Sequence, residues 1–150
     1  MDHDALAELH RLKYRYFRTL DLKLWDDFAD TLAEDASARY GTHAMGEPLD
    51  LQGRQAIVDF MRTNLTGDVI SMHLAQHPEL DVGGDTARGT WGFQDTVIVP
   101  SSRYLLTGAG YYDDTYARGA DGRWRITSTA YRRVFEATQP LPDGYTLAPV

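Results

Sequence analysis

The feature that most constrains the fold is a change of hydrophobic period at Gly67. Before Gly67, apolar residues recur every three or four positions in three segments, which is the spacing of one helical face. These residues are Leu6, Leu9, Leu12, Tyr16 and Leu20, then Leu24, Trp25, Phe28, Ala29 and Leu32, then Ala56, Ile57, Phe60, Met61 and Leu65. After Gly67 apolar residues alternate with polar ones, as in strands. Helices followed by a run of strands predict an α+β fold.

Four long strands are predicted over residues 69–82, 85–99, 104–118 and 123–136, with turns at 83–85 and 121–122. Two short strands, 37–41 and 48–52, are predicted between the second and third helices. One strongly curved sheet around the three helices would bury the apolar faces of both. The tail 137–150 holds three of the six prolines and is predicted to be an extended arm beyond a single domain, 1–136.

Composition limits the partners of this domain. The net charge is −7, with 22 acidic against 15 basic residues, which argues against nucleic acid or an anionic membrane surface as partner. No stretch approaches the roughly 20 apolar residues of a membrane span. The chain has no cysteine, so disulfides, a cysteine nucleophile and thiolate metal sites are excluded. With no signal-peptide pattern at the N-terminus, a cytoplasmic location is expected.

Asp21 lies at the junction of the first two helical segments, between Leu20 and Leu22. Aspartate is a favoured N-cap, so Asp21 is a candidate cap for a helix that begins at Leu22. The capping box is incomplete, because Leu24 stands where Glu or Gln would complete it. A carboxylate held rigidly at such a junction could also face inward as one half of a catalytic pair. The sequence leaves both roles open.

His73 and His77 lie four residues apart on a predicted strand. At about 3.3 Å per residue they stand roughly 13 Å apart, too far to bind one metal ion together. No other ligand pattern occurs in the sequence, so no metal site is expected. The face of His73 also carries Ser71 and Ala75, and this face could simply be half solvated.

Asp95 is an acid on an otherwise bulky apolar strand face. It alternates in register with Trp91, Phe93, Val97 and Val99. A buried, unpaired carboxylate would cost several kcal/mol or take up a proton, so Asp95 needs a partner or a wet cavity. A β-bulge that turns Asp95 outward is the structural alternative.

Arg132 and Arg133 end the last long strand, and a regular strand turns one of them inward. Parity with Trp124, Ile126 and Ala130 favours Arg132, which could bind a substrate carboxylate or pair with Asp95. A surface position is the alternative for either arginine. Aromatic side chains are abundant on the strands, and Trp91, Phe93 and Tyr112 are the predicted walls of a substrate pocket. Tyr16 lies five residues before Asp21 and is one of several tyrosines that are core or interface aromatics by default; one of them could serve as a general acid, but the sequence alone does not choose it.

The segments "LHRLKYRYFRTLDLKLWDDFADTLAEDA", "GRQAIVDFM", "SMHLAQHPELDV", "DTARGTWGFQD" and "WRITSTAYRRVF" together resemble the SnoaL-like branch of the nuclear transport factor 2-like superfamily, which includes scytalone dehydratase and bile acid 7α-dehydratase. The resemblance covers about residues 5 to 135. It implies a cone-shaped α+β barrel, with three helices packed on a mostly antiparallel sheet that encloses a deep pocket. It also implies a catalytic pair, Asp21 and His73, assisted by Tyr16 and Asp95, with Arg132 or Arg133 on the last strand.

The resemblance predicts a lyase that needs no cofactor and removes water from a hydrophobic, ring-containing small molecule. In this hypothesis His73 is the base and Asp21 orients its ring. Tyr16, or a protonated Asp95, would assist the leaving hydroxyl. The same pair could serve an isomerase or a cyclase, and the superfamily also includes non-catalytic assembly domains. Apolar residues on both faces of the predicted sheet indicate a homodimer or homotrimer.

Overall fold

The computed structural model describes residues 2–41 and 46–148. Two helices come first, α1 (His3–Asp21) and α2 (Trp25–Asp30), followed by strands β1 (Leu32–Tyr40) and β2 (Leu49–Gln52) and helix α3 (Arg54–Asn64). Four long strands complete the chain: β3 (Ile70–Gly83), β4 (Thr86–Val99), β5 (Tyr104–Arg118) and β6 (Trp124–Pro140). Helices packed against one sheet confirm the predicted α+β class.

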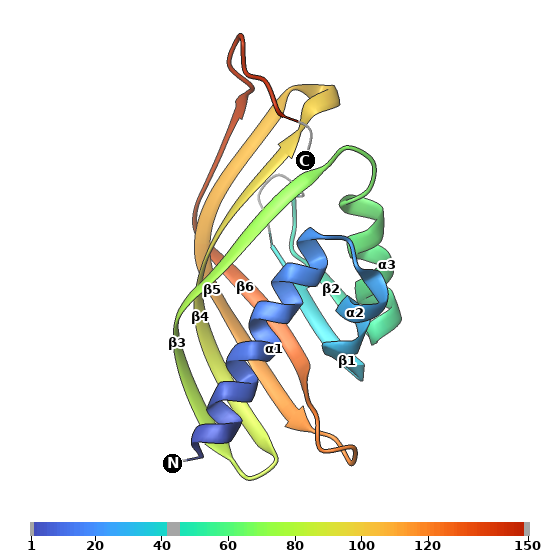
Figure 1. The fold of residues 1–150 in the computed structure, drawn as a ribbon, viewed down its shortest axis with the longest axis vertical. Coiled ribbons are helices and arrows are strands. Elements are labelled where there is room, and N and C mark those ends of the chain that lie inside the picture. Colours follow the sequence, from blue (N-terminus) through green and yellow to red (C-terminus); the bar gives the residue numbers. More distant parts are fainter. Residues whose placement is uncertain (1, 42–45, 149–150) are drawn as a thin grey trace.

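The six strands form one mixed sheet in the order β2-β1-β6-β5-β4-β3. Among the strands of the described residues, only the β1–β6 pair is parallel; the other neighbours are antiparallel. The long strands bow around α1, while α2 and α3 lie beside β1 and β2 (Figure 1). The sheet is therefore an open cone, with β2 and β3 as its edges, and its concave face covers the helices.

Two boundaries differ from the predicted ones. Leu32, expected to end the second helix, instead begins β1, because it pairs with Ile126 of β6. The arm expected from residue 137 begins later, since residues 137–140 continue β6 and pair with β5. Residues 141–148 form no helix or strand, and the last two residues of the predicted arm lie outside the described part of the chain.

Helix α1 is held at both ends by its own sequence. Asp2 caps the first turn by accepting a hydrogen bond from the backbone N–H of Ala5 at 3.0 Å. The helix ends at Asp21, and Lys23 then takes a left-handed backbone conformation (φ 58°) that turns the chain toward α2. Asp21 is thus the last residue of α1 and not the cap of the next helix.

No helix in the described ranges has the length and apolarity needed to cross a bilayer.

Register shifts decide which side chains of the long strands face the helices. In β3 the shift falls at His77–Pro78, where His77 has a φ of 47°. Before the shift, odd-numbered residues face inward, and after it the even-numbered residues do. In β6 two extra residues, Thr127 and Val134, produce similar shifts relative to β5. The inward face of β6 therefore changes from even to odd residues after Ile126.

A buried ion pair joins α1 to the centre of the sheet. Lys13 Nζ lies 2.7 Å from Asp114 of β5, and both side chains are fully buried. Asp114 also accepts hydrogen bonds from Tyr116 (2.8 Å) and Thr129 (2.7 Å), so both of its oxygens are occupied. Burial lowers the pKa of Lys13, and the charge and hydrogen bond of Asp114 act in the opposite direction. The Lys13 ammonium also lies 3.7 Å from the ring centroid of Tyr112.

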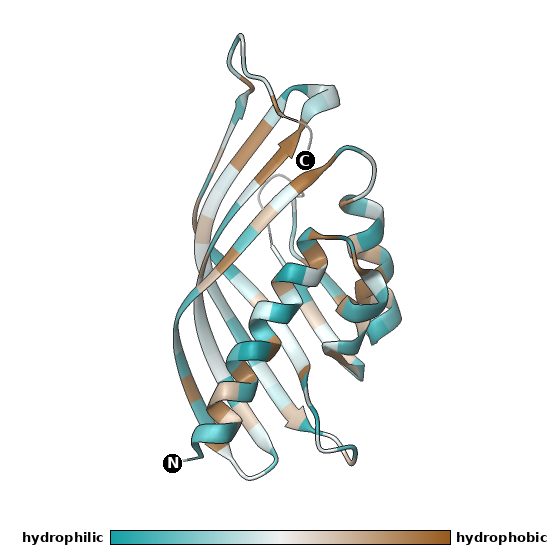
Figure 2. Ribbon diagram, in the orientation of Figure 1, coloured by the Kyte–Doolittle hydropathy of each residue, from teal (hydrophilic) through white to brown (hydrophobic). Residues whose placement is uncertain are grey.

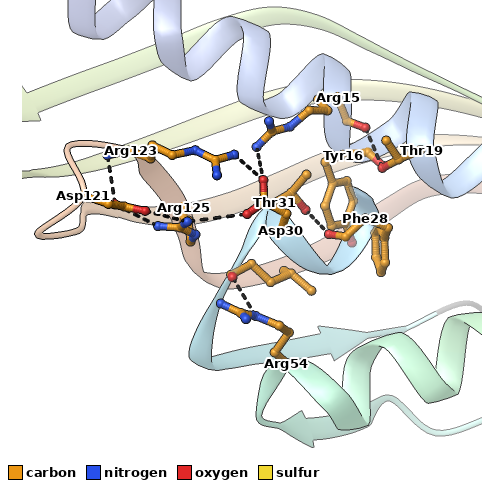
Figure 3. A network of polar contacts seen from close by, with 11 residues as sticks. Arg15, Tyr16, Thr19, Phe28, Asp30, Thr31, Arg54, Asp121, Arg123 and Arg125 are labelled. Atoms are coloured by element: carbon orange, nitrogen blue, oxygen red, sulfur yellow. Dashed lines mark hydrogen bonds and ion pairs between the residues drawn. The ribbon is translucent and has the colours of Figure 1, made fainter. Parts of the chain in front are cut away.

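A second ionic cluster joins α1 and α2 to the β5–β6 turn at the surface. Asp30 pairs with Arg15 of α1, with Arg123 of the β5–β6 turn and with Arg125 at the start of β6 (Figure 3). Partial burial raises the pKa of Asp30, but the hydrogen bond from Arg123 and the three positive charges outweigh it, so the pKa is lowered overall. The cluster ties the short helix α2 to the end of the sheet.

Asp114→Asn is expected to destabilise the fold by about 3–5 kcal/mol, because it leaves the Lys13 ammonium buried without its counter-charge. Urea unfolding followed by circular dichroism measures this loss. The double variant Lys13→Met/Asp114→Asn removes both charges and should recover much of the loss. An Asp114→Asn protein with the urea midpoint of the parent would contradict this account of the buried pair.

Candidate active site

Asp21 and His73 meet on the concave side of the sheet. Asp21 Oδ1 lies 2.6 Å from His73 Nδ1, and Oδ2 accepts a hydrogen bond from the backbone N–H of His73 at 2.8 Å. Ser71 Oγ donates to Asp21 Oδ1 at 2.8 Å. Because an ionised carboxylate only accepts hydrogen bonds, Nδ1 is assigned the ring proton and Nε2 keeps a lone pair. In this arrangement the Asp21 carboxylate orients an imidazole that could act as a base.

Helix α1 also fixes the plane of the imidazole. Phe17, one turn before Asp21, stacks on the His73 ring with centroids 5.3 Å apart and planes inclined by 20°. The side chains of Asp21 and His73 are only 9% and 11% exposed. The imidazole is therefore held on one face by an aromatic ring and at one nitrogen by a carboxylate, so that Nε2 has one fixed direction.

A row of polar residues crosses four strands next to this pair. The register aligns His73 of β3 with Asp95 of β4, Asp95 with Gly108 of β5, and Gly108 with Glu136 of β6. Asp95 is buried and faces inward, so the alternative in which a bulge turns it outward does not hold. Asp95 Oδ2 lies 3.8 Å from His73 Nε2, beyond a hydrogen bond.

Arg133 fills the space between the two carboxylates of this row. Its Nη1 and Nη2 donate to the two oxygens of Asp95 at 2.8 and 2.7 Å, and its Nε lies 2.8 Å from Glu136. Burial would lower the pKa of Arg133, but its contacts with Asp95 outweigh this and raise it. The two-pronged pairing is typical of an ionised carboxylate. It differs from the protonated Asp95 that the sequence suggested.

The guanidinium has room only because residue 108 is glycine. A Cβ at Gly108 would stand 2.1 Å from Arg133 Nη1 and 3.0 Å from Asp95 Oδ1. Nearby, a Cβ at Gly110 would meet the backbone oxygen of Arg132 at 2.1 Å and the ring of Phe93 at 2.8 Å. In the "GAG" sequence at 108–110, the two glycines of β5 thus leave space for side chains from the neighbouring strands.

A cavity of about 220 Å³ opens beside His73, Asp95 and Arg133. Apart from Asn64, the rest of its wall is apolar or aromatic and comes from α1, α3 and the residue that follows it, and strands β1, β4, β5 and β6. Those residues are Leu20, Tyr40, Phe60, Met61, Asn64, Leu65, Phe93, Val97, Tyr104, Leu106, Tyr112 and Tyr131. Such a pocket, apolar with a few convergent polar groups, is a typical small-molecule site.

Two predicted pocket walls, Phe93 and Tyr112, line this cavity, but Arg132 does not. The parity argument that turned Arg132 inward is wrong, because the extra residue at Thr127 reverses the faces of β6 and makes Arg132 exposed. Trp91 does face inward. However, it is fully buried against His10 and Tyr14 of α1 and donates a hydrogen bond to Tyr116, away from the cavity.

Tyr16 lies one layer behind the cavity wall. Its hydroxyl is 2.6 Å from that of Tyr40, which does line the cavity, and its side chain is fully buried. Burial and its tyrosine neighbours raise the pKa of Tyr16 well above the ordinary value. Tyr16 therefore supports Tyr40 and does not itself reach a molecule in the cavity.

Three contributors to the site were missed in the sequence. Glu136 lies next to a register shift that a single sequence does not reveal. Gly108 could have been found from the "GAG" motif, because glycine inside a strand often marks a close approach. Phe17 could have been found from helical spacing, since it lies one turn before Asp21 and so on the same helix face.

Comparison with known proteins agrees with this fold. Residues 2–130 match the model of the SnoaL-like domain. The chain belongs to the SnoaL-like domain family. This family is a branch of the nuclear transport factor 2-like superfamily, as the sequence motifs predicted.

Solved structures share the SnoaL-like fold at low sequence identity. A putative scytalone dehydratase from Novosphingobium aromaticivorans has a TM-score of 0.78 at 18% identity, covering 95% of both chains. A hexachlorocyclohexane dehydrochlorinase from Novosphingobium barchaimii also has a TM-score of 0.78, at 16% identity, covering 98% of this chain and 96% of that one. A protein from Catenulispora acidiphila has a TM-score of 0.72 at 22% identity, with 87% and 91% coverage.

Gly108→Ala is expected to push the guanidinium of Arg133 away from Asp95. The loss of this buried pairing should destabilise the protein by about 1–3 kcal/mol and change the imidazole NMR signals of His73. Gly83→Ala is the matched control, because a methyl group there meets nothing within 4 Å. If the two variants had equal stability and the same imidazole signals, the described role of Gly108 would be wrong.

Proposed function

We propose that this protein is a cofactor-independent lyase of the dehydratase type, acting on a hydrophobic, ring-containing small molecule. The observation that carries the proposal is the 2.6 Å contact between Asp21 and His73 Nδ1 at the wall of an apolar cavity. It leaves Nε2 of a neutral imidazole free to take a proton from carbon. An imidazole has an ordinary pKa near 6.5 and is well suited to this role at neutral pH.

In the proposed elimination, His73 Nε2 removes a proton from the carbon next to an activating group. The electron pair of that C–H bond forms the new double bond, and the neighbouring C–O bond breaks. The imidazolium of His73 gives its proton to the departing hydroxyl group, which leaves as water, so the substrate is neither oxidised nor reduced. Asp21 stabilises the imidazolium that forms and keeps the ring oriented.

Asp95 and Arg133 are proposed to act on the oxygen atoms of the substrate. Arg133 has five N–H donors, and its bonds to Asp95 use one on each terminal nitrogen. Because Nε faces Glu136, the second N–H of each terminal nitrogen is the one that can donate to a leaving hydroxyl or to a carbonyl. Asp95 fixes the guanidinium, and Arg133 replaces Tyr16 as the group that assists the leaving oxygen.

An isomerase or a cyclase remains the alternative, because proton abstraction by His73 is common to all three reactions. The products distinguish them. A dehydratase forms water and a new double bond, and its product is lighter than the substrate by one water molecule. An isomerase conserves the mass.

His73→Asn is expected to lower kcat/KM by about 10²- to 10⁴-fold, the usual contribution of a positioned base. The assay follows loss of water from hydroxylated cyclic ketones by mass spectrometry. His77→Asn is the matched control on the same strand, because His77 is exposed and asparagine tolerates its left-handed backbone. Full activity in a folded His73→Asn protein would rule out His73 as the base, whereas a parent protein that removes water from none of these ketones would favour a non-catalytic binding domain.

We also propose that the outer face of the sheet binds a second copy of the chain, in a homodimer or homotrimer. Three cross-strand rows of this face contain no charged residue: Leu74, Gln94, Ala109 and Phe135; Met72, Thr96, Thr107 and Ala137; and Ile70, Ile98, Leu105 and Gln139. Met72 and Phe135 are 57% and 53% exposed. Brown, hydrophobic stretches mark the upper parts of β3, β4 and β5 in Figure 2. In a chain of net charge −7, this charge-free area lets two copies meet without repulsion.

Met72→Glu is expected to convert the oligomer to a monomer, because it places a carboxylate in the middle row of this charge-free face, on the exposed edge strand β3. Sedimentation equilibrium measures the mass. Leu49→Glu, on the opposite edge strand β2, is the control and should leave the mass unchanged. A parent protein that sediments as a monomer would contradict the proposal.

A further inference from the structure

The charges around the cavity are unequally matched. Arg133 has two carboxylate partners, Asp95 and Glu136, whose side chains are only 3% and 7% exposed. Asp21 adds a third carboxylate on the far side of His73. The site therefore holds three carboxylates and one guanidinium, so it carries a net charge of minus two with a neutral imidazole and minus one with an imidazolium.

The other polar groups of the cavity wall are uncharged. Burial raises the pKa of Tyr112 well above its ordinary value and that of Tyr131 to about 12, so both phenols stay protonated at neutral pH. Asn64 contributes a neutral amide. The ammonium of Lys13, behind the Tyr112 ring, is matched by Asp114. None of the charged residues described in or behind the wall offers an unmatched positive charge to a ligand.

We infer that the cavity selects uncharged ring compounds and rejects carboxylates, and that Glu136 sets this selectivity by holding the charge of Arg133. The inference rests on the proposed function, since it names the substrate class of the same site. A ligand carboxylate would meet a net negative site, and Arg133 is already neutralised. A hydroxyl or carbonyl oxygen can still accept hydrogen bonds from Arg133 and the tyrosines without carrying charge into the cavity.

Glu136 is a specificity-determining residue in this inference because of its position. It lies in the same cross-strand row as His73 and Asp95, on the opposite side of the guanidinium from the imidazole. Replacing its carboxylate by an amide keeps the shape of the side chain and removes one negative charge. Arg133 would then have one carboxylate partner in place of two.

The test compares 2-naphthol with 2-naphthoate, which share a ring system but are neutral and anionic at pH 7.5. Dissociation constants are measured by isothermal titration calorimetry. The parent protein should bind 2-naphthol at least about tenfold more tightly, the size expected of one like charge in a partly buried site. Glu136→Gln should strengthen 2-naphthoate binding by about tenfold and change 2-naphthol binding by less than about twofold. Glu34→Gln, at an exposed position of β1, removes the same charge and should change neither constant.

Equal or tighter binding of 2-naphthoate by the parent protein would overturn the inference, and so would identical behaviour of the Glu136→Gln and Glu34→Gln variants. Failure of both naphthalenes to bind would overturn it as well, because an uncharged ring must enter the cavity. The binding measurement does not depend on turnover. Selective binding of 2-naphthol by a protein whose activity survives His73→Asn would refute the proposed His73 mechanism and leave the selectivity of the cavity standing.

Discussion

The buried contact between Lys13 and Asp114 is the constraint on which the site depends. Lys13, Phe17 and Asp21 follow one another at intervals of four residues, so they share one face of α1. Once Lys13 is fixed on β5, Phe17 is directed at the imidazole and Asp21 at its nitrogen. The eight residues from Lys13 to Asp21 span about 12 Å of helix, at a rise of about 1.5 Å each. A buried ion pair contributes little net stability, but it specifies one position for the helix, and that position brings Asp21 and His73 together.

The strands of the sheet supply the other residues of the site. These residues are far apart in the sequence and are brought together by the register of the strands. His73, Asp95, Gly108 and Glu136 belong to four different strands and come together because the pairing aligns them in one row. A guanidinium fits over this row where glycine leaves space. Each buried charge in the row thereby has an opposite charge beside it, which removes most of the cost of its burial.

The sequence predicted the order of the elements, because period three to four and period two are local signals. Asp21 and His73 were predicted from the family resemblance, and the structure brings them within hydrogen-bond distance. Register shifts were not predictable, since a bulge depends on how two strands pair. Because of the extra residue at Thr127, Arg133 and not Arg132 faces inward. Trp91 does face inward, as its strand parity predicted, but it lies away from the cavity. Alternation tells which face a residue occupies, but not which part of that face the cavity reaches.

Strand β3 connects the inner site with the outer face. Ser71 and His73 point inward, while Met72 and Leu74 point outward, so a shift of one residue in register would replace the imidazole in the cavity by a leucine. The bulge at His77 confines this arrangement to the first half of the strand, and beyond it Leu80 turns inward to the core. One pleated strand thus presents its polar side chains to the cavity and its apolar ones to the outer face. Contact on that outer face would hold the strand in the register that the Asp21–His73 pair requires.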